Sequence, residues 1–221
     1  LISLFARGGT GGNGFDAFGA GGAGGSVTLD QRGTVEASGT GTPAISLLSQ
    51  GGAAGLRGGT TTSRGGTSRD RMALDAGGVG GTVTASIAAS AWVVTTGANA
   101  PALIAASNGG NGGNADANTS TYYGSNGGAG GTVRVTNDGH VIAFGEGASA
   151  IVLQSVGGTG GRGAGGAFTS AAAGAPGGNG GTVSAVNTGE VWTFGSYGFG
   201  ILAQSVGGAG GQGASAAFGS G

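Results

Sequence analysis

The sequence predicts an all-β fold, a parallel β-helix solenoid to which each repeat contributes one coil. A glycine phrase occurs four times, each time followed by Ser or Thr and then Val, at residues 21–25, 77–81, 127–131 and 177–181. After each phrase come three short segments in which apolar residues alternate, the pattern of β-strands. A repeat of this kind indicates a stacked array, because one unit alone cannot bury its apolar face.

The apolar positions define the register in which the coils stack. Four valines begin the units and set repeats of 56, 50 and 50 residues: Val27, Val83, Val133 and Val183. Two further columns are expected, one through the middle strands at Val35, Val93, Val141 and Val191, and one through the last strands at Ile45, Leu103, Ile151 and Ile201. This alignment places a two-residue insertion of the second unit between Thr84 and Trp92.

Strands and turns follow in order within each unit. In the last unit the expected strands are 182–185, 190–194 and 200–205. The first turn, for example 137–139 or 187–189, ends in a glycine that is free to take a positive φ, and a second glycine-containing turn such as 145–147 follows the middle strand. Coils about 4.8 Å apart also align hydroxyl side chains, so we expect a hydroxyl ladder in the column Ser49, Ser107, Ser155 and Ser205.

The glycine-rich half of each repeat has a period of three. Two glycines per triplet suit a threefold extended helix of the polyglycine-II-like kind, because two of its sides then contact neighbouring backbones while the third residue faces outward. We therefore expect ordered excursions that tolerate a change of Thr159 better than Gly158→Val or Gly161→Val. Flexible coil is the alternative. The middles of the excursions vary, which favours them as contact sites: they are 15–18, 60–76, 115–125 and 167–175.

Composition excludes several classes of function. Only 8% of the residues are charged and the net charge is −1, so the chain has no basic surface for nucleic acid. Cysteine is absent, which excludes disulfides and thiolate metal sites. The apolar stretches are shorter than the roughly 20 residues of a membrane-spanning helix, so we expect neither nucleic acid partners nor direct membrane insertion.

The domain organisation predicted is one repeat array over residues 1–221. A partial unit covers 1–25, the units 26–81, 82–131 and 132–181 follow, and a partial last unit covers 182–221. Solenoids need capping units, and neither end of the sequence resembles one. We therefore expect a fragment of a longer solenoid.

The phrase Gly-Ile-Leu-Ala-Gln-Ser-Val-Gly-Gly-Ala-Gly-Gly at 200–211 resembles the repeat of very large autotransporter passenger domains of Gram-negative bacteria. The related phrase at 150–158 and the strand phrase 181–191 share the resemblance, which is weaker in the first two units, where Leu48 and Ala106 replace the glutamine. The resemblance implies a right-handed β-helix that is exported by type V secretion and stays at the bacterial cell surface. It also implies an adhesin or surface fibre, with a host or abiotic surface, or other copies of the chain, as partners.

Catalytic chemistry is not expected from these residues: the sequence predicts no enzyme, no catalytic residue, no cofactor and no metal. The single histidine, His140, is expected to point outward from a strand, and the carboxylates Asp138, Glu146 and Glu190 to be solvated at turns. Residues 11–18 fit the calcium-binding nonapeptide pattern through Asp16, but that site requires tandem copies.

Exposed aromatic residues leave two interpretations open. Trp192, Tyr197 and Phe199 could form a platform for sugar stacking, or the glycine-rich excursions could cover them. Tyr122 and Tyr123 at an excursion tip are comparable candidates for surface contact.

The alternatives to an adhesin are a purely structural filament or sheath that self-associates through glycine-rich sheets, and an ice- or crystal-binding repeat. Against the last, Arg134 interrupts the column Thr28, Thr84 and Ser184.

Overall fold

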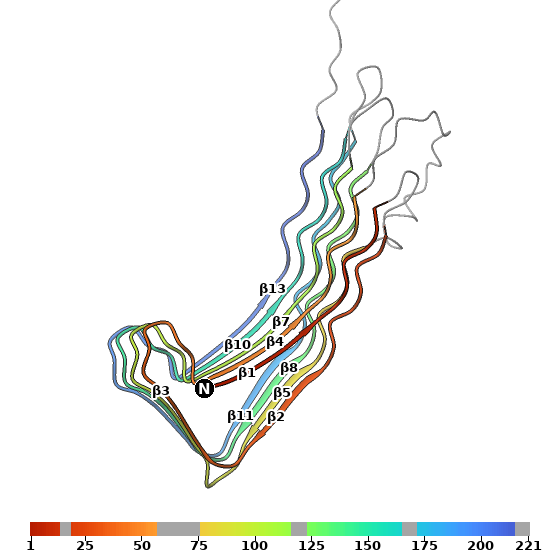
Figure 1. Cartoon of the computed structure of the whole chain (residues 1–221). Coiled ribbons are helices and arrows are strands. Elements are labelled where there is room, and N and C mark those ends of the chain that lie inside the picture. The colour runs from red at the N-terminus through yellow and green to blue at the C-terminus, as the bar shows by residue number, and fades with distance from the viewer. Residues whose placement is uncertain (14–18, 57–75, 116–122, 165–171, 215–221) are drawn as a thin grey trace, which may run out of the picture.

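The computed structural model describes residues 1–13, 19–56, 76–115, 123–164 and 172–214 (Figure 1). Within these ranges the regular elements are thirteen β-strands, and all strand pairs are parallel. They form one five-stranded and two four-stranded sheets. The prediction of an all-β fold with parallel sheets is therefore confirmed.

Each sheet collects the equivalent strand of successive repeats. The first sheet has the order β1-β4-β7-β10-β13, with β1 (Ile2–Arg7), β4 (Ile45–Gln50), β7 (Leu103–Asn108), β10 (Ile151–Val156) and β13 (Ile201–Val206). The second has the order β11-β8-β5-β2, with β2 (Val27–Gln31), β5 (Val83–Ile87), β8 (Val133–Asn137) and β11 (Val183–Asn187). The third has the order β12-β9-β6-β3, with β3 (Thr34–Ala37), β6 (Trp92–Thr95), β9 (His140–Ala143) and β12 (Glu190–Thr193).

The register of the sheets agrees with the alignment of the repeats. As predicted, equivalent valines lie opposite one another in the second sheet and in the third sheet. Equivalent Ile or Leu residues lie opposite one another in the first sheet. Gln31 pairs with Ile87 and Thr34 with Trp92, so residues 88–91 lie opposite 32–33. The predicted insertion of two residues is confirmed at this turn.

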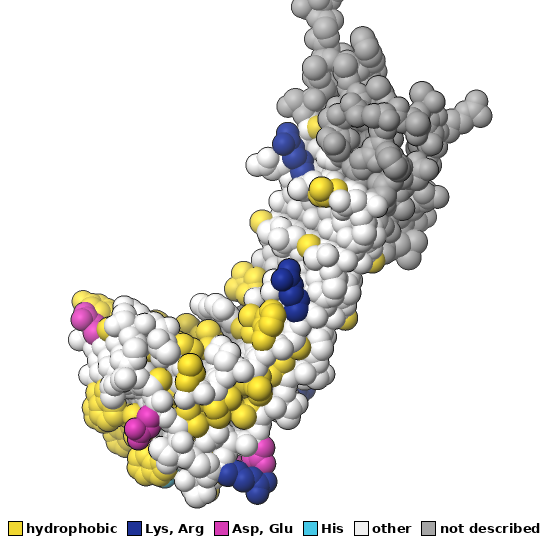
Figure 2. Space-filling view, in the orientation of Figure 1, with side chains coloured by type: hydrophobic (Ala, Val, Ile, Leu, Met, Phe, Trp, Pro, Cys, Tyr) yellow, Lys and Arg dark blue, Asp and Glu magenta, His cyan; other side chains and the backbone are white. Residues whose placement is uncertain are grey.

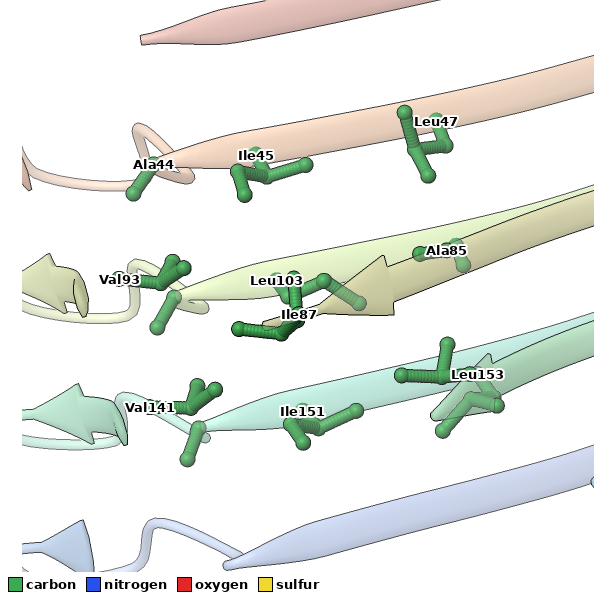
Figure 3. Close-up of a cluster of buried hydrophobic side chains, with 14 of the residues drawn as sticks. Ala44, Ile45, Leu47, Ala85, Ile87, Val93, Leu103, Val141, Ile151 and Leu153 are labelled. Carbon is green, nitrogen blue, oxygen red and sulfur yellow. The ribbon is translucent and has the colours of Figure 1, made fainter. Parts of the chain in front are cut away.

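The core lies between the three sheets and is narrow and aliphatic (Figure 3). Along β8 and β9 burial alternates, so that one side chain in two points inward. The fully buried side chains stack in columns along the solenoid, with Leu103, Ile151 and Leu153 among the largest. Burying such a side chain contributes about 1.5–3 kcal/mol, which is why one coil needs its neighbours.

The first turn differs from the prediction. Positive φ was expected at its glycine, but among the described glycines a positive φ occurs only at Gly41 and Gly147, in the second turn. The glycine of the first turn serves close stacking instead, because a Cβ on Gly139 would lie 2.7 Å from the carbonyl oxygen of Ala91. Asn137 holds this turn: its side chain is buried and its Oδ1 accepts from the Gly139 N–H at 3.2 Å.

The second turn places one residue per coil in the left-handed region. Gly41 and Gly147 have φ values of 65° and 66°, and the equivalent residues Asn99 and Tyr197 have 52° and 64°. Glycine and asparagine adopt this conformation readily, whereas a tyrosine does so at a cost. Tyr197 is therefore the strained member of this column.

The serine column does not form the predicted hydroxyl ladder. Each of its buried hydroxyls bridges two glycine-rich segments: Ser155 Oγ donates to the Gly131 carbonyl at 2.7 Å and accepts from the Gly181 N–H at 2.8 Å. Ser49 and Ser107 bond in the same way. A backbone N–H and C=O that lack a partner compete more strongly for a buried hydroxyl than another serine does.

The glycine-rich segments continue from the sheets as two layers of arms that lie side by side (Figure 1). We call the segments that leave the first sheet outgoing arms and those that enter the second sheet incoming arms. Within the outgoing layer, every third residue donates to the arm of the next coil, for example Gly157 N–H to Val206 at 2.9 Å and Gly160 N–H to Ala209 at 2.8 Å. The incoming layer bonds likewise, with Gly77 N–H to Asn126 and Gly80 N–H to Ala129.

A second set of hydrogen bonds joins the two layers. It forms a zigzag in which each glycine donates to the one before it, with N···O distances of 2.7–2.8 Å, through Gly9, Gly22, Gly52, Gly78, Gly110, Gly128, Gly158, Gly178 and Gly208. The third residue of each triplet faces outward, and Thr159 and Arg162 are exposed while Gly158 and Gly161 are buried. The described parts of the excursions are thus ordered by backbone bonds, as the triplet period predicts.

Candidate functional site

The largest group of exposed aromatic side chains lies on the outer face of the third sheet. On β6, β9 and β12 the outward positions carry Trp92, His140 and Trp192, and Phe144 and Phe194 follow directly after β9 and β12. In Figure 2 hydrophobic side chains gather at the lower left, on the side where β3 is labelled in Figure 1. We call this surface the aromatic face.

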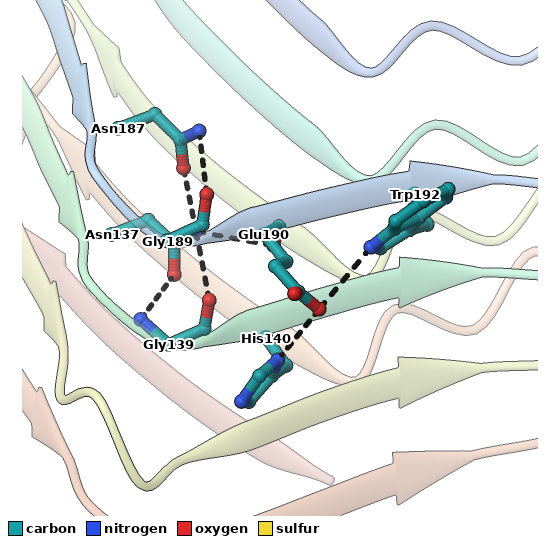
Figure 4. A network of polar contacts seen from close by, with 7 residues as sticks. All are labelled: Asn137, Gly139, His140, Asn187, Gly189, Glu190 and Trp192. Carbon is teal, nitrogen blue, oxygen red and sulfur yellow. Dashed lines mark hydrogen bonds and ion pairs between the residues drawn. The ribbon is translucent and has the colours of Figure 1, made fainter.

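The centre of the aromatic face is a three-coil polar cluster (Figure 4). His140 stacks on Trp92, with ring centroids 4.1 Å apart and planes at 18°. His140 Nδ1 lies 3.0 Å from Glu190 Oε2, which also accepts from Trp192 Nε1 at 3.4 Å. His140 therefore points outward as predicted. Glu190 is exposed, as predicted, and its carboxylate also has two side-chain partners.

A second stack lies beside this cluster. Phe144 and Phe194 have ring centroids 4.9 Å apart and planes at 9°, and Trp192 lies parallel to Phe194 at 6.1 Å. Trp192 is 51% exposed, so of its two predicted environments the covering by glycine-rich arms is wrong. Tyr197 and Phe199, at the turn after β12, are also exposed.

Ring stacking along the solenoid limits which ring faces are accessible. His140 occupies one face of Trp92, and Phe194 occupies one face of Phe144. The other face of Trp92 is directed toward β3, where its register partner is the small residue Thr34. Open ring faces are thus found at the border between large and small outward residues.

A shallow recess of about 150 Å³ lies at this border. Its lining residues are Glu36, Ala37, Ser38, Val94 and Thr96. It therefore combines one carboxylate and two hydroxyls with apolar groups.

A wider hollow of about 610 Å³ lies on the outer face of the second sheet, lined among others by Thr28, Thr84, Ser86 and Asp138. At its rim Arg32 Nη2 is 2.7 Å from Asp30 Oδ2. The hydrogen bond that Arg32 donates to Asp30, together with the negative charge of Asp30, raises the pKa of Arg32. The cation and the anion of this rim neutralise each other, and Asp138 is the remaining charged residue in the lining of the hollow.

The other sequence candidates have ordinary structural roles or lie elsewhere. Among the described residues there is no group of three His, Cys, Asp or Glu that could hold a metal. Asp16, Tyr122 and the excursion middles 15–18, 60–75, 116–122 and 167–171 lie outside the described residues. Tyr123 is described and is 41% exposed. Asp138 accepts from the hydroxyl of Thr188.

Residues 109–114, Gly-Gly-Asn-Gly-Gly-Asn, match the glycines of the calcium-binding nonapeptide pattern but lack its carboxylate, and their asparagines have a structural role. Asn111 Oδ1 accepts from the Thr159 N–H at 3.1 Å, and Asn114 Oδ1 accepts from the Arg162 N–H at 2.8 Å. Each of these amide oxygens therefore links two neighbouring outgoing arms, because it accepts from the backbone N–H of the outward-facing residue in a triplet of the next arm.

The two layers of arms present different outer surfaces. The outgoing layer exposes polar residues such as Asn111, Thr159 and Arg162. The incoming layer exposes small apolar residues, among them Ala23, Val79 and Pro176.

Sequence reasoning missed the contact between His140 and Glu190, although a signal for it exists. The two residues are 50 apart, which is the length of the repeat, and they therefore occupy one column. Their opposite chemistry in one column indicates a cross-strand pair.

No protein-family model matches the chain, and searches of curated proteins and of solved structures found no similar protein. No helix among the described residues is long and apolar enough to cross a membrane. The architecture and surface define a class, a glycine-rich repeat protein of stacked parallel strands with an aromatic outer face.

Proposed function

We propose that the chain is part of the shaft of an adhesin or surface fibre of the autotransporter type, located at the outside of a Gram-negative cell. In this proposal the three parallel sheets are the walls of a right-handed parallel β-helix, and the arms form a polyglycine-II-like double layer beside it. The shaft carries attachment away from the cell and is not an enzyme.

The observation that carries this proposal is the zigzag of hydrogen bonds between the arms. It runs without interruption from Gly9 to Gly208 and adds a second hydrogen-bonded scaffold to the three sheets. Ordering glycine costs more backbone entropy than ordering any other residue. A chain that offsets this cost in every described coil is organised for a stiff, extended shape, which is what a shaft requires.

The chemistry of the surface is consistent with this role. The His140–Glu190 pair has the separation of an acid–base dyad, but it lies on an open sheet face from which water is not excluded. Repeats with few charges also suit export, because each newly exported coil can fold onto the coil that was exported before it.

Surface labelling of intact cells tests the proposal. Antibody raised against this chain should label cells that carry the full-length protein without permeabilisation, and cells from whose protein residues 1–221 are deleted should lose labelling and attach less to surfaces. Deletion of 132–181, one repeat in register, is the matched control and should retain labelling. Labelling that requires permeabilisation would contradict the proposal.

A second candidate function, a filament or sheath that self-associates, is favoured by the incoming arms. Their outward residues are mostly small and apolar, with Asn179 as an exposed polar member, and Val79 is 50% exposed. Lateral association through this surface predicts concentration-dependent sedimentation that Val79→Glu abolishes, while Thr159→Glu on the opposite layer leaves it unchanged. A monomer at all concentrations would exclude this candidate.

A further inference from the structure

The first turn of the second coil is longer than the turns beside it and borders the hollow on the outer face of the second sheet. Residues 88–91 lie opposite 32–33 of the first coil and 138–139 of the third. In Figure 1 this turn is the yellow-green loop that extends beyond the other coils below β2. Its start is held by the Ala88 N–H, which donates to the Gln31 carbonyl at 2.9 Å. The turn therefore forms a fixed wall of the hollow.

Hydroxyl groups line the hollow beside this wall. Thr28 of β2 lies opposite Thr84 of β5, and Ser86 follows Thr84 on the same outer face. Thr84 and Ser86 are half-buried. Ser90 in the wall donates from its Oγ to the Arg32 carbonyl at 3.5 Å, so the wall is also tied to the first coil. Two neighbouring coils thus present hydroxyls to one ligand.

One carboxylate in the lining is not balanced by a cation of the lining. Arg32 and Asp30 form an ion pair at 2.7 Å, and Asp138 is the remaining charged residue. Asp138 is positioned by both neighbouring coils, because its N–H donates to the Ile87 carbonyl at 2.9 Å and its carboxylate accepts from the Thr188 hydroxyl. The hollow therefore has a net negative charge at a defined place.

We propose that this hollow binds two adjoining rings of a surface polysaccharide that contains free amino groups, such as a polymer of glucosamine. Ser86 and Asp138 are one coil and two residues apart, about 8 Å between their Cα atoms, so one ring contacts both and its ammonium group pairs with Asp138. The next ring lies over Thr28 and Thr84, whose hydroxyls bond to it. The proposal deepens the proposed attachment role and rests on that role for its biological meaning.

Volume, hydroxyls and charge favour this ligand over others. The hollow has a volume of about 610 Å³, within the roughly 300–1,000 Å³ of sites for small ligands, so it has room for two rings. A simple amine such as a lysine side chain would leave the hydroxyls of the floor without partners from the ligand. A carboxylate repels uronic and sialic acids and attracts an ammonium group.

The experiment is an amide NMR titration of the chain with the β-1,4-linked disaccharide of glucosamine. Cellobiose is the matched control ligand, because it has hydroxyls in place of the amines. The amides of Thr84, Ser86 and Asp138 should shift with the glucosamine disaccharide. Cellobiose should bind about twofold to fivefold more weakly, the difference expected for one exposed ion pair.

Two variants test the named side chains. Asp138→Asn keeps the shape of the side chain and should reduce the affinity for the glucosamine disaccharide to that for cellobiose, whereas Glu146→Gln, a change of an exposed carboxylate outside the hollow, should not. Ser86→Leu fills the floor and should remove binding of both disaccharides. Ser184→Leu is its control, because Ser184 is also half-buried on the outer face of the second sheet but does not line the hollow.

Three results would overturn the proposal: no shift of these amides at tens of millimolar, an unchanged preference for the glucosamine disaccharide in Asp138→Asn, or equal affinity for the amide of Nα-acetyl-lysine, which would assign the hollow to a peptide. Circular dichroism that matches the unchanged chain shows that lost binding in a variant is not caused by unfolding. Because the titration uses the chain alone, its failure leaves the surface labelling of cells unaffected, and the two proposals fail separately.

Discussion

Gly158→Val tests whether backbone packing between the arms stabilises the protein. A Cβ on Gly158 would lie 2.5 Å from the carbonyl carbon of Gly110 and closer still to its oxygen. Carbon atoms prefer separations of about 3.5–4.0 Å, so the arms must move apart by roughly 1 Å. That movement lengthens two bonds of the zigzag, Gly158 N–H to Gly128 and Gly128 N–H to Gly110.

The expected loss follows from these contacts. Overpacking costs about 1–3 kcal/mol, and two weakened backbone bonds cost about 0.5–1.5 kcal/mol each. The free energy of local opening should therefore fall by roughly 2–6 kcal/mol. Thr159→Val is the matched control, because it introduces the same side chain at an exposed outward position of the same triplet.

Hydrogen exchange read by mass spectrometry measures this loss. Amides of 109–113, 127–131 and 157–161 should exchange faster in Gly158→Val, while β13 keeps its protection and Thr159→Val resembles the unchanged chain. Equal protection in both variants, or no protection of the arms in the unchanged chain, would refute the reasoning that the arms are a hydrogen-bonded scaffold.

Three further substitutions test the turns and the serine column. Tyr197→Gly should raise the free energy of unfolding by about 0.5–1 kcal/mol, because glycine removes the strain of a φ of 64°; unchanged or lower stability in urea unfolding would contradict this. Ser155→Ala should cost about 1–3 kcal/mol because it removes a buried hydroxyl that bonds to the carbonyl of Gly131 and the N–H of Gly181, whereas the exposed Ser196→Ala should cost less than about 0.5 kcal/mol. Asn137→Ala should cost about 1–3 kcal/mol in thermal unfolding, because Asn137 is buried and its amide donates to Asn187 at 2.7 Å. A smaller loss than for Asn187→Ala, a change of the exposed partner, would contradict this role of Asn137.

The sequence was sufficient to predict the register but not the partners of polar side chains. Columns such as Val35, Val93 and Val141 follow from spacing alone, because parallel in-register stacking places like residues on one another. The hydroxyl of Ser155 belongs to such a column, yet it bonds to glycine backbone that lies 24 and 26 residues away. That choice depends on how closely the arms approach the first sheet, which spacing does not encode.

The turn glycines show the same limit. Glycine is compatible with both a positive φ and a close backbone approach, and the sequence does not distinguish these two needs. The comparison of coils distinguishes them, because Asn99 and Tyr197 replace glycine in the second turn, where φ is positive. At Gly189 in the first turn, a Cβ would lie 2.5 Å from the carbonyl carbon of Asp138.

Surface and scaffold are thus subject to different constraints. Most inward columns keep aliphatic residues and vary in size, as in Leu47, Ala105 and Leu153, because coils stacked about 4.8 Å apart leave little room in a narrow core. One buried column at the first turn is mixed and contains Gln31, Ile87 and Asn137. The outward column Thr34, Trp92, His140 and Glu190 changes its chemistry at every coil while the backbone pairing stays in register. Outward residues of the aromatic face can therefore change at little cost to the fold, and the change from Thr34 to Trp92 leaves one face of the Trp92 ring without a stacking partner from the preceding coil.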